Sequence, residues 1–456
     1  MYSERLQKMR TYFESGITRP YHFRKQQLIL LQQTIKKYEK EINEALFTDL
    51  KKNAEEAYIG ETGLIYAEIK LLLKRLKKWM KPQTVGTDML NFPSASKIYR
   101  DPLGVVLIIA PWNYPFQLSL LPLVGAIAGG NCVVLKPSEF APASASVIQK
   151  IIHQVFPAEY VLVAEGDGAA IIPAMTDAFR FDHIFYTGSI PVGKAIYASA
   201  AKNLIPVTLE LGGKSPAIVE ADADIKVAAK RIITGKFLNA GQTCIAPDYV
   251  LVNEEVKQQL VERMAESILS FYGSNAEESY EYGKIINERR FDKLVSYLQE
   301  GEIITGGKFN REKLYISPTI LHQIKAGAAI MQDEIFGPLL PVISYKTTGE
   351  AIEIVKQHAN PLALYLFTAS NDKQQQWIAN VPFGGGCINN TVMYFSNHRL
   401  PFGGVGNSGI GAYHGKYTFN VFTRLKPVMK SPVWFDPPIK YPPFKGKLNL
   451  FKMFKR

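Results

Sequence analysis

The chain has 456 residues, of which 47% are hydrophobic, so it is too apolar for a disordered protein and long enough for more than one packed domain. Its formal net charge of +12 is uneven, because residues 424–456 hold nine basic residues and a single acidic one. The rest of the chain is nearly neutral, which argues against a nucleic-acid partner and leaves a basic C-terminal tail to be explained.

The N-terminal part of the chain is predicted to be helical. Apolar residues recur every three or four positions through residues 5–78, which is the spacing of amphipathic helices. Residues 82–96 are predicted to form an extended excursion. The uncharged stretch 102–135 is long enough to cross a bilayer, but three prolines interrupt it, so we expect buried strand, loop and helix there.

Beyond this stretch, apolar strand-like runs alternate with helix-length segments, the order typical of parallel sheets with crossover helices. A first series suggests a dinucleotide-binding domain of the Rossmann type. Its predicted strands are residues 105–110, 132–135, 160–164, 183–186 and 207–211. A second series follows Gly212, with predicted strands at residues 217–219, 249–252, 320–321, 340–343 and 364–368.

Cys244 is the candidate nucleophile, in the segment N-A-G-Q-T-C-I-A at residues 239–246. A thiolate is a strong nucleophile, and the small residues before it would let a substrate approach closely. A lone cysteine between apolar residues is more often an inert core residue, the interpretation that we give to Cys132 and Cys387. Three cysteines so far apart indicate a reducing compartment, so we expect a cytoplasmic protein without a secretory leader.

Two further segments carry candidate catalytic groups. Glu210 ends a β-branched strand before two glycines, where a desolvated carboxylate can act as a general base on water; a solvated Glu at the sheet rim is the alternative. Asn113 lies in the loop A-P-W-N-Y-P-F at residues 110–116, where its amide could donate to a developing oxyanion; an Asn that caps its own turn is the alternative. The aromatic residues of this loop favour an apolar substrate entrance, although such residues also fill cores.

In their order along the chain and in their residues, these segments resemble the aldehyde dehydrogenase superfamily, and the resemblance extends over nearly the whole chain. F-E-S-G-I-T-R at residues 13–19 and A-Y-H-G-K at residues 412–416 are similar to its class 3 branch, which includes fatty aldehyde dehydrogenases. The other motifs are K-P-S-E at 136–139, F-Y-T-G-S at 185–189, E-L-G-G-K-S-P at 210–216, G-Q-T-C at 241–244, E-I-F-G-P at 334–338 and P-F-G-G-V-G-N-S-G at 401–409.

The resemblance implies an α/β fold with two parallel-sheet domains, a Rossmann-type cofactor domain and a catalytic domain, and a small β arm for oligomerisation. A homodimer is therefore expected, and apolar residues in the excursion support it, because such residues prefer burial at an interface. The expected boundaries are 1–81 and 102–209 for the NAD-binding domain, 210–390 for the catalytic domain, 82–101 and 391–425 for the arm, and 426–456 for the basic aromatic tail.

The resemblance also implies the cofactor site. Gly188 follows a strand and opens a helix, but the glycine spacing differs from the G-x-G-x-x-G fingerprint, so only the resemblance places the pyrophosphate at this helix N-terminus. Glu139 would meet the adenosine ribose and repel a 2′-phosphate, so we expect NAD, with NADP as the alternative. For Lys136 and Glu139 a surface ion pair is the competing interpretation. The implied cofactor residues are Lys136, Glu139, Gly188, Ser189, Gly193, Glu334 and Phe336.

The implied reaction is the oxidation of a medium- or long-chain aliphatic, or an aromatic, aldehyde to the carboxylic acid. Cys244 would attack the carbonyl carbon, its backbone N–H and Asn113 would stabilise the oxyanion, and Glu210 would activate the water that hydrolyses the thioester. The presence of a base favours hydrolysis over acyl transfer to coenzyme A. A cofactor-free cysteine hydrolase and a catalytically idle protein on the same fold are the alternatives.

The histidines and the tail complete the sequence predictions. The seven histidines have no zinc-ligand spacing, so we expect no metal site and only a packing role for His414. In the tail, Phe444, Leu448, Phe451 and Phe454 fall on one face of a predicted helix of about three turns. With the basic residues around them, they predict peripheral contact with an anionic membrane; packing over the partner subunit or the substrate entrance is the alternative.

Overall fold

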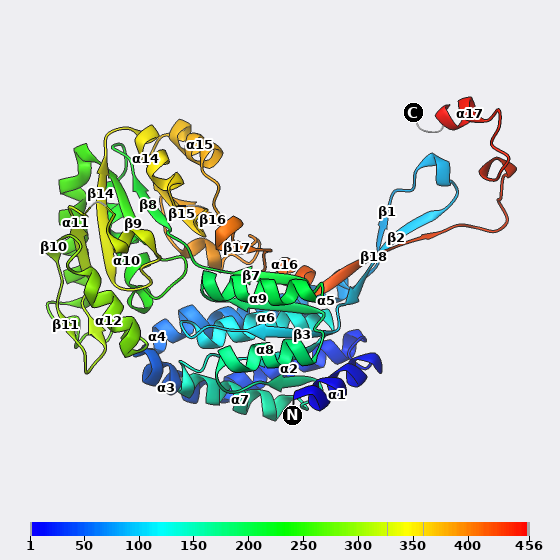
Figure 1. Cartoon of the computed structure of the whole chain (residues 1–456), viewed down its shortest axis with the longest axis horizontal. Coiled ribbons are helices and arrows are strands. Elements are labelled where there is room, and N and C mark those ends of the chain that lie inside the picture. The colour runs from blue at the N-terminus through cyan, green and yellow to red at the C-terminus, as the bar shows by residue number, and fades with distance from the viewer. Residues whose placement is uncertain (1, 326, 359, 454–456) are drawn as a thin grey trace.

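The computed structural model describes residues 2–325, 327–358 and 360–453, which form a body built around two sheets and a projecting arm (Figure 1). Helices open the chain, as the periodicity predicts, and bury their apolar faces against the first sheet and its helices. They are α1 Tyr2–Glu14, α2 Tyr21–Lys37, α3 Glu39–Leu50, α4 Ala54–Ala57, the π-helix η1 Tyr58–Thr62 and α5 Gly63–Trp79.

The first sheet has six strands in the order β17-β7-β6-β3-β4-β5, all parallel except β17. Every residue of β3, β4 and β6 is buried, because helices cover both faces of a parallel sheet. The strands are β3 Val105–Ile109, β4 Cys132–Lys136, β5 Val161–Val163, β6 His183–Thr187, β7 Val207–Glu210 and β17 Gly409–Ile410. The helices between them are α6 Pro115–Gly129, α7 Pro142–Val155, α8 Gly168–Ala178 and α9 Ile190–Lys202.

The second sheet has seven strands in the order β10-β13-β14-β9-β8-β15-β16, parallel except for β10. The predicted α/β fold with two parallel sheets is thus confirmed. The strands are β8 Pro216–Val219, β9 Tyr249–Asn253, β10 Glu302–Thr305, β13 Thr319–His322, β14 Leu339–Tyr345, β15 Ala363–Phe367 and β16 Gly385–Ile388, beside a small hairpin, β11 Phe309–Asn310 and β12 Tyr315–Ile316. The helices are α10 Ile225–Phe237, α11 Lys257–Tyr272, α12 Glu288–Tyr297, α13 Ala329–Gln332, α14 Thr348–Lys356 and α15 Asn371–Asn380.

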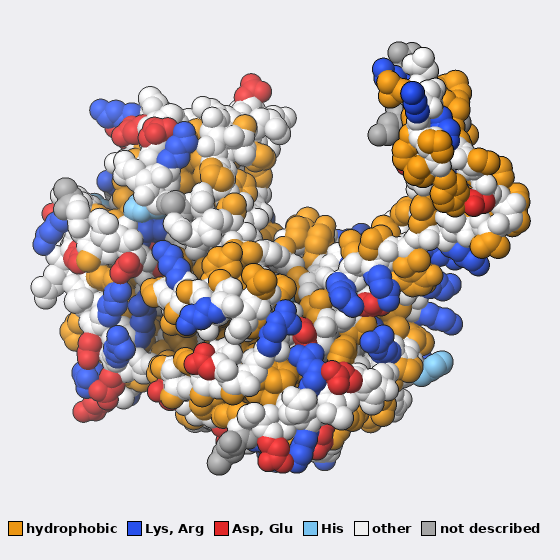
Figure 2. Space-filling model, turned by 45° about the vertical axis from the view of Figure 1, so that its right-hand side comes forward, with side chains coloured by type: hydrophobic (Ala, Val, Ile, Leu, Met, Phe, Trp, Pro, Cys, Tyr) orange, Lys and Arg blue, Asp and Glu red, His pale blue; other side chains and the backbone are white. Residues whose placement is uncertain are grey.

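The arm is an antiparallel ribbon of β1 Gln83–Val85, β2 Ala95–Pro102 and β18 Thr423–Lys430, in that order. It projects from the body with the tail at its far end (Figure 1). Apolar side chains cover much of the arm and tail surface (Figure 2). Among them, Met89, Phe92 and Leu425 are more than half exposed, and Trp434 in the tail is 78% exposed. The arm therefore has an apolar surface that the chain itself does not cover.

The predicted arm segment 391–425 differs from the structure. Only its last residues join the arm, since β18 begins at Thr423 and pairs with β2 along its whole length, to Lys430. The part before it returns to the body, where β17 pairs with β7 and α16, Lys416–Val421, packs against α6. The physical reason is burial, because Phe419 and Phe422 fill the core. This glycine-rich segment has no periodic apolar pattern from which that burial could be predicted.

The predicted tail helix begins later than expected. Within the described residues helix α17 spans Leu448–Met453, because Gly446 has a φ of +83° and the chain before it forms turns. Phe444 precedes the helix and packs edge-on against Phe451, with ring centroids 5.8 Å apart. Phe454 lies outside the described residues. The remaining short helices are η2 Met89–Asn91, η3 Leu238–Gly241, η4 Glu254–Val256, η5 Met393–Ser396, η6 Gly406–Ser408 and η7 Pro438–Lys440.

Candidate active site

Two cavities meet at Cys244. Thr187, Glu210 and Cys244 line both of them. One cavity, of about 130 Å³, is walled mainly by apolar side chains, among them Leu118 and Leu238. The other, of about 490 Å³, shares residues 187–189 with a third cavity of about 760 Å³. The structure therefore brings the predicted nucleophile and base to the junction between an apolar cavity and a long, more polar one.

The loop of Cys244 is tightly folded between α10 and β9. Asn239, Ala240 and Gly241 all have positive φ, and a Cβ at Gly241 would lie 2.3 Å from the carbonyl oxygen of Gly337. Only glycine permits this approach, which joins the Cys244 loop to the loop of Glu334 and Phe336. The small residues of the sequence motif are thus needed for the backbone path.

Cys244 is a half-buried free cysteine. Burial raises the pKa of the thiol, and the carboxyl groups of Glu334 and Glu210 raise it further. The N–H groups of Cys244 and Ile245 act in the opposite direction. A thiolate here therefore needs an additional positive charge or a proton acceptor close to the sulfur.

Glu210 ends β7 and is only 2% exposed. Neither of its carboxylate oxygens has a hydrogen-bond partner among the described residues, and burial raises the pKa of the group well above its usual value. The sequence left a solvated Glu at the sheet rim as the alternative, and the burial excludes it. A desolvated carboxyl group beside the nucleophile is the arrangement that a general base requires.

Asn113 is fixed by a network that sequence reasoning missed. Its side-chain amide donates to the carbonyl of Gln242 at 3.0 Å, which ties it to the Cys244 loop. Its own carbonyl accepts from Lys52 and from the side chain of Asn239, both at 2.8 Å. Lys52 also pairs with Glu61 at 2.8 Å, and Glu61 accepts two N–H groups in the first turn of α6. Lys52 lies in the loop between α3 and α4 and Glu61 in the π-helix η1, in an N-terminal region where charged residues usually indicate a solvated face.

The 760 Å³ cavity is lined by Lys136 and Glu139, which form an ion pair at 2.8 Å. The ion pair of the competing interpretation is present, and it joins the buried Lys136 to the exposed Glu139. Glu139 also accepts the N–H of Gly168 at 2.8 Å. Partial burial acts to raise the pKa of Glu139, yet the two hydrogen bonds lower it below its usual value, so the carboxylate is ionised at neutral pH.

Gly188 and Ser189 line both polar cavities at the N-terminus of α9. Gly193 is not among the residues that line these cavities. A Cβ there would lie 2.6 Å from the Leu211 side chain, so this glycine permits close packing of α9 on the end of β7. Of the three residues predicted to bind the cofactor at this helix N-terminus, Gly188 and Ser189 line the cavities. Gly193 supports the wall behind them.

Glu334 and Phe336 line the 490 Å³ cavity. Burial and Asp248 raise the pKa of Glu334 to about 8, although Arg290 opposes this shift. Phe336 has a φ of +48° and packs edge-on against Trp112, with ring centroids 5.4 Å apart. The 490 Å³ cavity, which Cys244 also lines, therefore has an aromatic wall and a second carboxyl group.

The loop before Glu334 is held by Lys214, a residue of the E-L-G-G-K-S-P motif that the sequence analysis did not single out. Its ammonium group contacts Asp248 at 2.5 Å and donates to the carbonyls of Ile330 and Asp333 at 2.7 and 3.0 Å. All of these partners are distant in sequence. Lys214 therefore positions the far wall of the cavity without lining it.

The aromatic residues of the Asn113 loop have separate roles. Tyr114 lines the apolar cavity and its hydroxyl lies 2.8 Å from that of Thr243. Trp112 faces the polar cavity instead, and Phe116 is core filler with no exposed surface. Of the three aromatic residues predicted to line an apolar substrate entrance, only Tyr114 lines the apolar cavity.

His414 lines the apolar cavity, where its ring stacks on Phe402 with centroids 5.1 Å apart. Within the described chain, no group of three or more His, Cys, Asp or Glu side chains is placed to bind a metal ion, so the absence of a metal stays a prediction. None of the helices that the structure describes combines the length and apolar character needed to cross a membrane.

Comparisons with known proteins agree with this geometry. The model of the family described as "Aldehyde dehydrogenase family" matches residues 3–428. A Staphylococcus aureus protein named 4,4'-diaponeurosporen-aldehyde dehydrogenase is 46% identical over 98% of this chain and 97% of its own. A dog enzyme named "Aldehyde dehydrogenase, dimeric NADP-preferring" is 42% identical over 98% and 99%. The solved structure of the substrate-bound state of Staphylococcus aureus AldH covers 100% of both chains with a TM-score of 0.98 and 45% identity.

The chain belongs to the aldehyde dehydrogenase family. The predicted class 3 branch is confirmed by relatives such as "Aldehyde dehydrogenase family 3 member H1" of Arabidopsis thaliana, 43% identical over 98% of this chain and 93% of its own. The protein is therefore an NAD(P)-dependent aldehyde dehydrogenase that oxidises aldehydes to acids. This result decides against the cofactor-free hydrolase and the catalytically idle protein.

Proposed function

We propose that the enzyme oxidises apolar aldehydes, medium- or long-chain aliphatic or aromatic, through a covalent thioester on Cys244. The observation that carries this proposal is the apolar cavity that ends at Cys244 beside the unpartnered Glu210. Hydrophobic side chains favour a substrate with a large apolar part. The name of the Staphylococcus aureus relative, which refers to a diaponeurosporen-aldehyde, agrees with such a substrate.

The cofactor fits the two polar cavities. They are joined through residues 187–189 at the N-terminus of α9, where backbone N–H groups and the helix dipole favour a pyrophosphate. Lys136 and Glu139 would hold the adenosine ribose, and Glu334 and Phe336 the nicotinamide end. When bound, NAD(P) supplies the hydride acceptor and a positive charge beside the thiol. The ionised Glu139 would repel a 2′-phosphate, so we favour NAD, with NADP as the alternative.

The residues of the chain divide the reaction into two halves. The Cys244 thiol loses its proton to water and its sulfur forms a bond to the carbonyl carbon, while the carbonyl electron pair moves to the oxygen, where the Asn113 amide and the Cys244 N–H stabilise it. After the hydride has left, the carbon is a thioester. Glu210 then takes a proton from water as the water oxygen attacks, and the carbon–sulfur bond breaks to release the acid and the thiolate.

The proposal is tested by NADH formation with a panel of alkanals and aromatic aldehydes. Cys244→Ser should lower turnover by about a thousandfold or more, the scale of losing a covalent nucleophile, and leave NAD binding intact. Cys132→Ser and Cys387→Ser are the matched controls and should stay active. Substantial turnover by Cys244→Ser would contradict the assignment.

We further propose that the arm forms a homodimer. In the ribbon, β18 is an edge strand with free backbone groups, and the apolar residues of the excursion and of β18 are exposed. A relative named as dimeric supports this assembly. A monomeric mass by light scattering at micromolar concentration would contradict it.

For the tail we propose peripheral contact of a cytoplasmic enzyme with anionic membrane, with packing over the partner or the substrate entrance as the alternative. Exposed Trp434, Phe444 and Leu448 lie among basic residues, and each basic residue near an anionic surface contributes about 1 kcal/mol. Cosedimentation with anionic liposomes is compared between the full chain and one that ends at Lys440. Equal binding by both, or binding that raised salt does not weaken, would contradict the membrane role.

A further inference from the structure

Glu56 is, besides Glu210, the acidic residue among those that line the apolar cavity. It lies on α4, directly before the π-helix Tyr58–Thr62, whose residues also form part of the cavity wall. Its Oε1 accepts a hydrogen bond from the N–H of Asn239 at 2.7 Å. Among the described residues no donor reaches the other oxygen, Oε2, so this cavity-lining carboxyl group keeps one oxygen without a protein partner.

No cation of the cavity wall offsets this carboxylate. The nearby Lys52 is already bound to Glu61 at 2.8 Å and to a backbone carbonyl. Burial raises the pKa of Glu56, while Lys52 and the backbone hydrogen bond act to lower it. The described residues that line the cavity include no Lys or Arg, and burial lowers the pKa of His414 to about 4, which leaves its ring neutral. The described lining therefore offers no cation, and Glu56 makes this wall negative once it ionises.

We propose that Glu56 sets the charge specificity of the site: it excludes aldehydes that carry a second, anionic group and restricts the enzyme to neutral and cationic aldehydes. The inference rests on the proposed function, because it assigns the substrate to this cavity. An anionic chain end would meet the Glu56 carboxylate between apolar walls, where charges are weakly screened. It would also lose its hydration without gaining a cationic partner from the described lining.

The test compares aldehydes of equal length that differ in the charge at the far end. The pairs are hexanal with adipate semialdehyde and octanal with suberate semialdehyde, each with saturating NAD in mildly alkaline buffer. kcat/KM is measured for the wild type, Glu56→Gln and Glu55→Gln. Glu55 is the matched control: it is exposed, its carboxylate accepts from Tyr280 at 2.7 Å, and its replacement removes the same charge outside the cavity.

We expect the wild type to use each semialdehyde at least about tenfold less well than the alkanal, on the scale of like charges brought together. Glu56→Gln should reduce this discrimination by about tenfold, and Glu55→Gln should leave it unchanged. An equal ratio in all three proteins would overturn the inference. So would a wild type that oxidises semialdehydes as well as alkanals, a result that does not depend on the folding of any variant. A wild type inactive on the alkanals and on the aromatic aldehydes of the panel would overturn the proposed function and this inference with it.

Discussion

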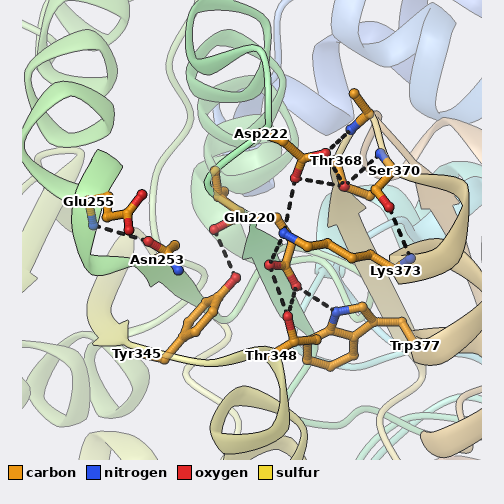
Figure 3. Close-up of polar contacts among 12 residues, drawn as sticks. Glu220, Asp222, Asn253, Glu255, Tyr345, Thr348, Thr368, Ser370, Lys373 and Trp377 are labelled. Atoms are coloured by element: carbon orange, nitrogen blue, oxygen red, sulfur yellow. Dashed lines mark hydrogen bonds and ion pairs between the residues drawn. The ribbon is translucent and has the colours of Figure 1, made fainter.

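Two buried glutamates, at the ends of consecutive strands, show how the same side chain is used for structure and for chemistry. Glu220 follows β8 and is 1% exposed, and Glu210 ends β7 and is 2% exposed. Glu220 accepts from Thr348 and Trp377 and pairs with Lys373 at 3.0 Å (Figure 3). Glu210 has no hydrogen-bond partner among the described residues. The two side chains are equally buried, but only Glu220 has hydrogen-bond partners. Glu220 therefore stabilises the fold, whereas Glu210 is suited to react.

Both glutamates lie at the carboxyl end of their strand, but only Glu210 lines the cavities. Ligands of open α/β sheets usually bind beyond the carboxyl ends of the strands, which is where Glu210 lies in the first sheet. In the second sheet the carboxyl ends carry the satisfied Glu220 cluster instead, and the loops before β9 and β14 bring Cys244 and Glu334 to the cavities. The second sheet therefore contributes to the site through its amino edge.

Replacement of each glutamate by glutamine tests this comparison with the largest expected effect. Glu210→Gln should lower steady-state turnover by about 10²- to 10⁴-fold, the usual contribution of a general base, and leave a burst of NADH as the thioester accumulates. Its unfolding free energy should not fall, because the variant replaces a desolvated carboxyl group. Stopped-flow absorbance and urea denaturation measure the two effects.

Glu220→Gln should do the reverse. It should lose about 1–3 kcal/mol of unfolding free energy, since its buried partners are left poorly satisfied, and keep its turnover. The comparison breaks if Glu210→Gln turns over normally without a burst. It also breaks if a folded Glu220→Gln is inactive.

Two buried asparagines extend the comparison with a smaller effect. Asn131 is fully satisfied, with its oxygen accepting two N–H groups and its amide donating to two carbonyls. Among the described residues, the side chain of Asn113 makes one hydrogen bond, the donation to the Gln242 carbonyl. Asn113→Ala should slow the NADH burst by about 10²- to 10³-fold, the effect of losing one oxyanion donor. Asn131→Ala should lower stability and leave the burst rate intact, and equal burst rates in both variants would contradict the distinction.

Much of the first sheet follows from sequence. Its predicted strands agree within one residue at each end with β3, β4, β5, β6 and β7, because uninterrupted apolar runs are typical of parallel strands covered on both faces. The two-residue strand β17 has no such run. It is determined by its pairing with β7, almost two hundred residues earlier in the chain, which no local pattern encodes.

Site residues that belong to a motif could be predicted from the sequence. Residues that hold a motif in place by tertiary contacts could not. Cys244, Glu210 and Asn113 stand in recognisable segments, and the structure brings them to one junction. Lys52, in the loop after α3, and Glu61, in η1, fix the Asn113 loop from the N-terminal region, where their charges predict solvent exposure. Buried ion pairs are set by tertiary contact, so the helical pattern alone cannot distinguish them from surface charges.

Glu68 offers the smallest effect and an intermediate case. This buried residue of α5 accepts from Gly415 at 2.9 Å and from Thr418 at 3.2 Å, so it has two neutral donors, whereas Glu220 has a charged partner and Glu210 has none. Burial raises the pKa of Glu68 to about 7, and the hydrogen bonds offset this only in part. In the folded state the protonated form is therefore favoured over a wider pH range than in the unfolded chain.

The sign of the pH effect follows from this shift. Because the folded pKa of about 7 exceeds the value of 4.5 for an unperturbed Glu, the contribution of Glu68 to stability is fully present below pH 4.5 and is lost as the pH rises through 7. The loss is at most about 3 kcal/mol. Glu68→Gln keeps an oxygen acceptor but cannot ionise, so urea unfolding should show it more stable than the wild type at high pH and equal at low pH. Parallel curves would mean that two neutral donors suffice to keep a carboxylate ionised at this depth, and Glu68 would then belong with Glu220.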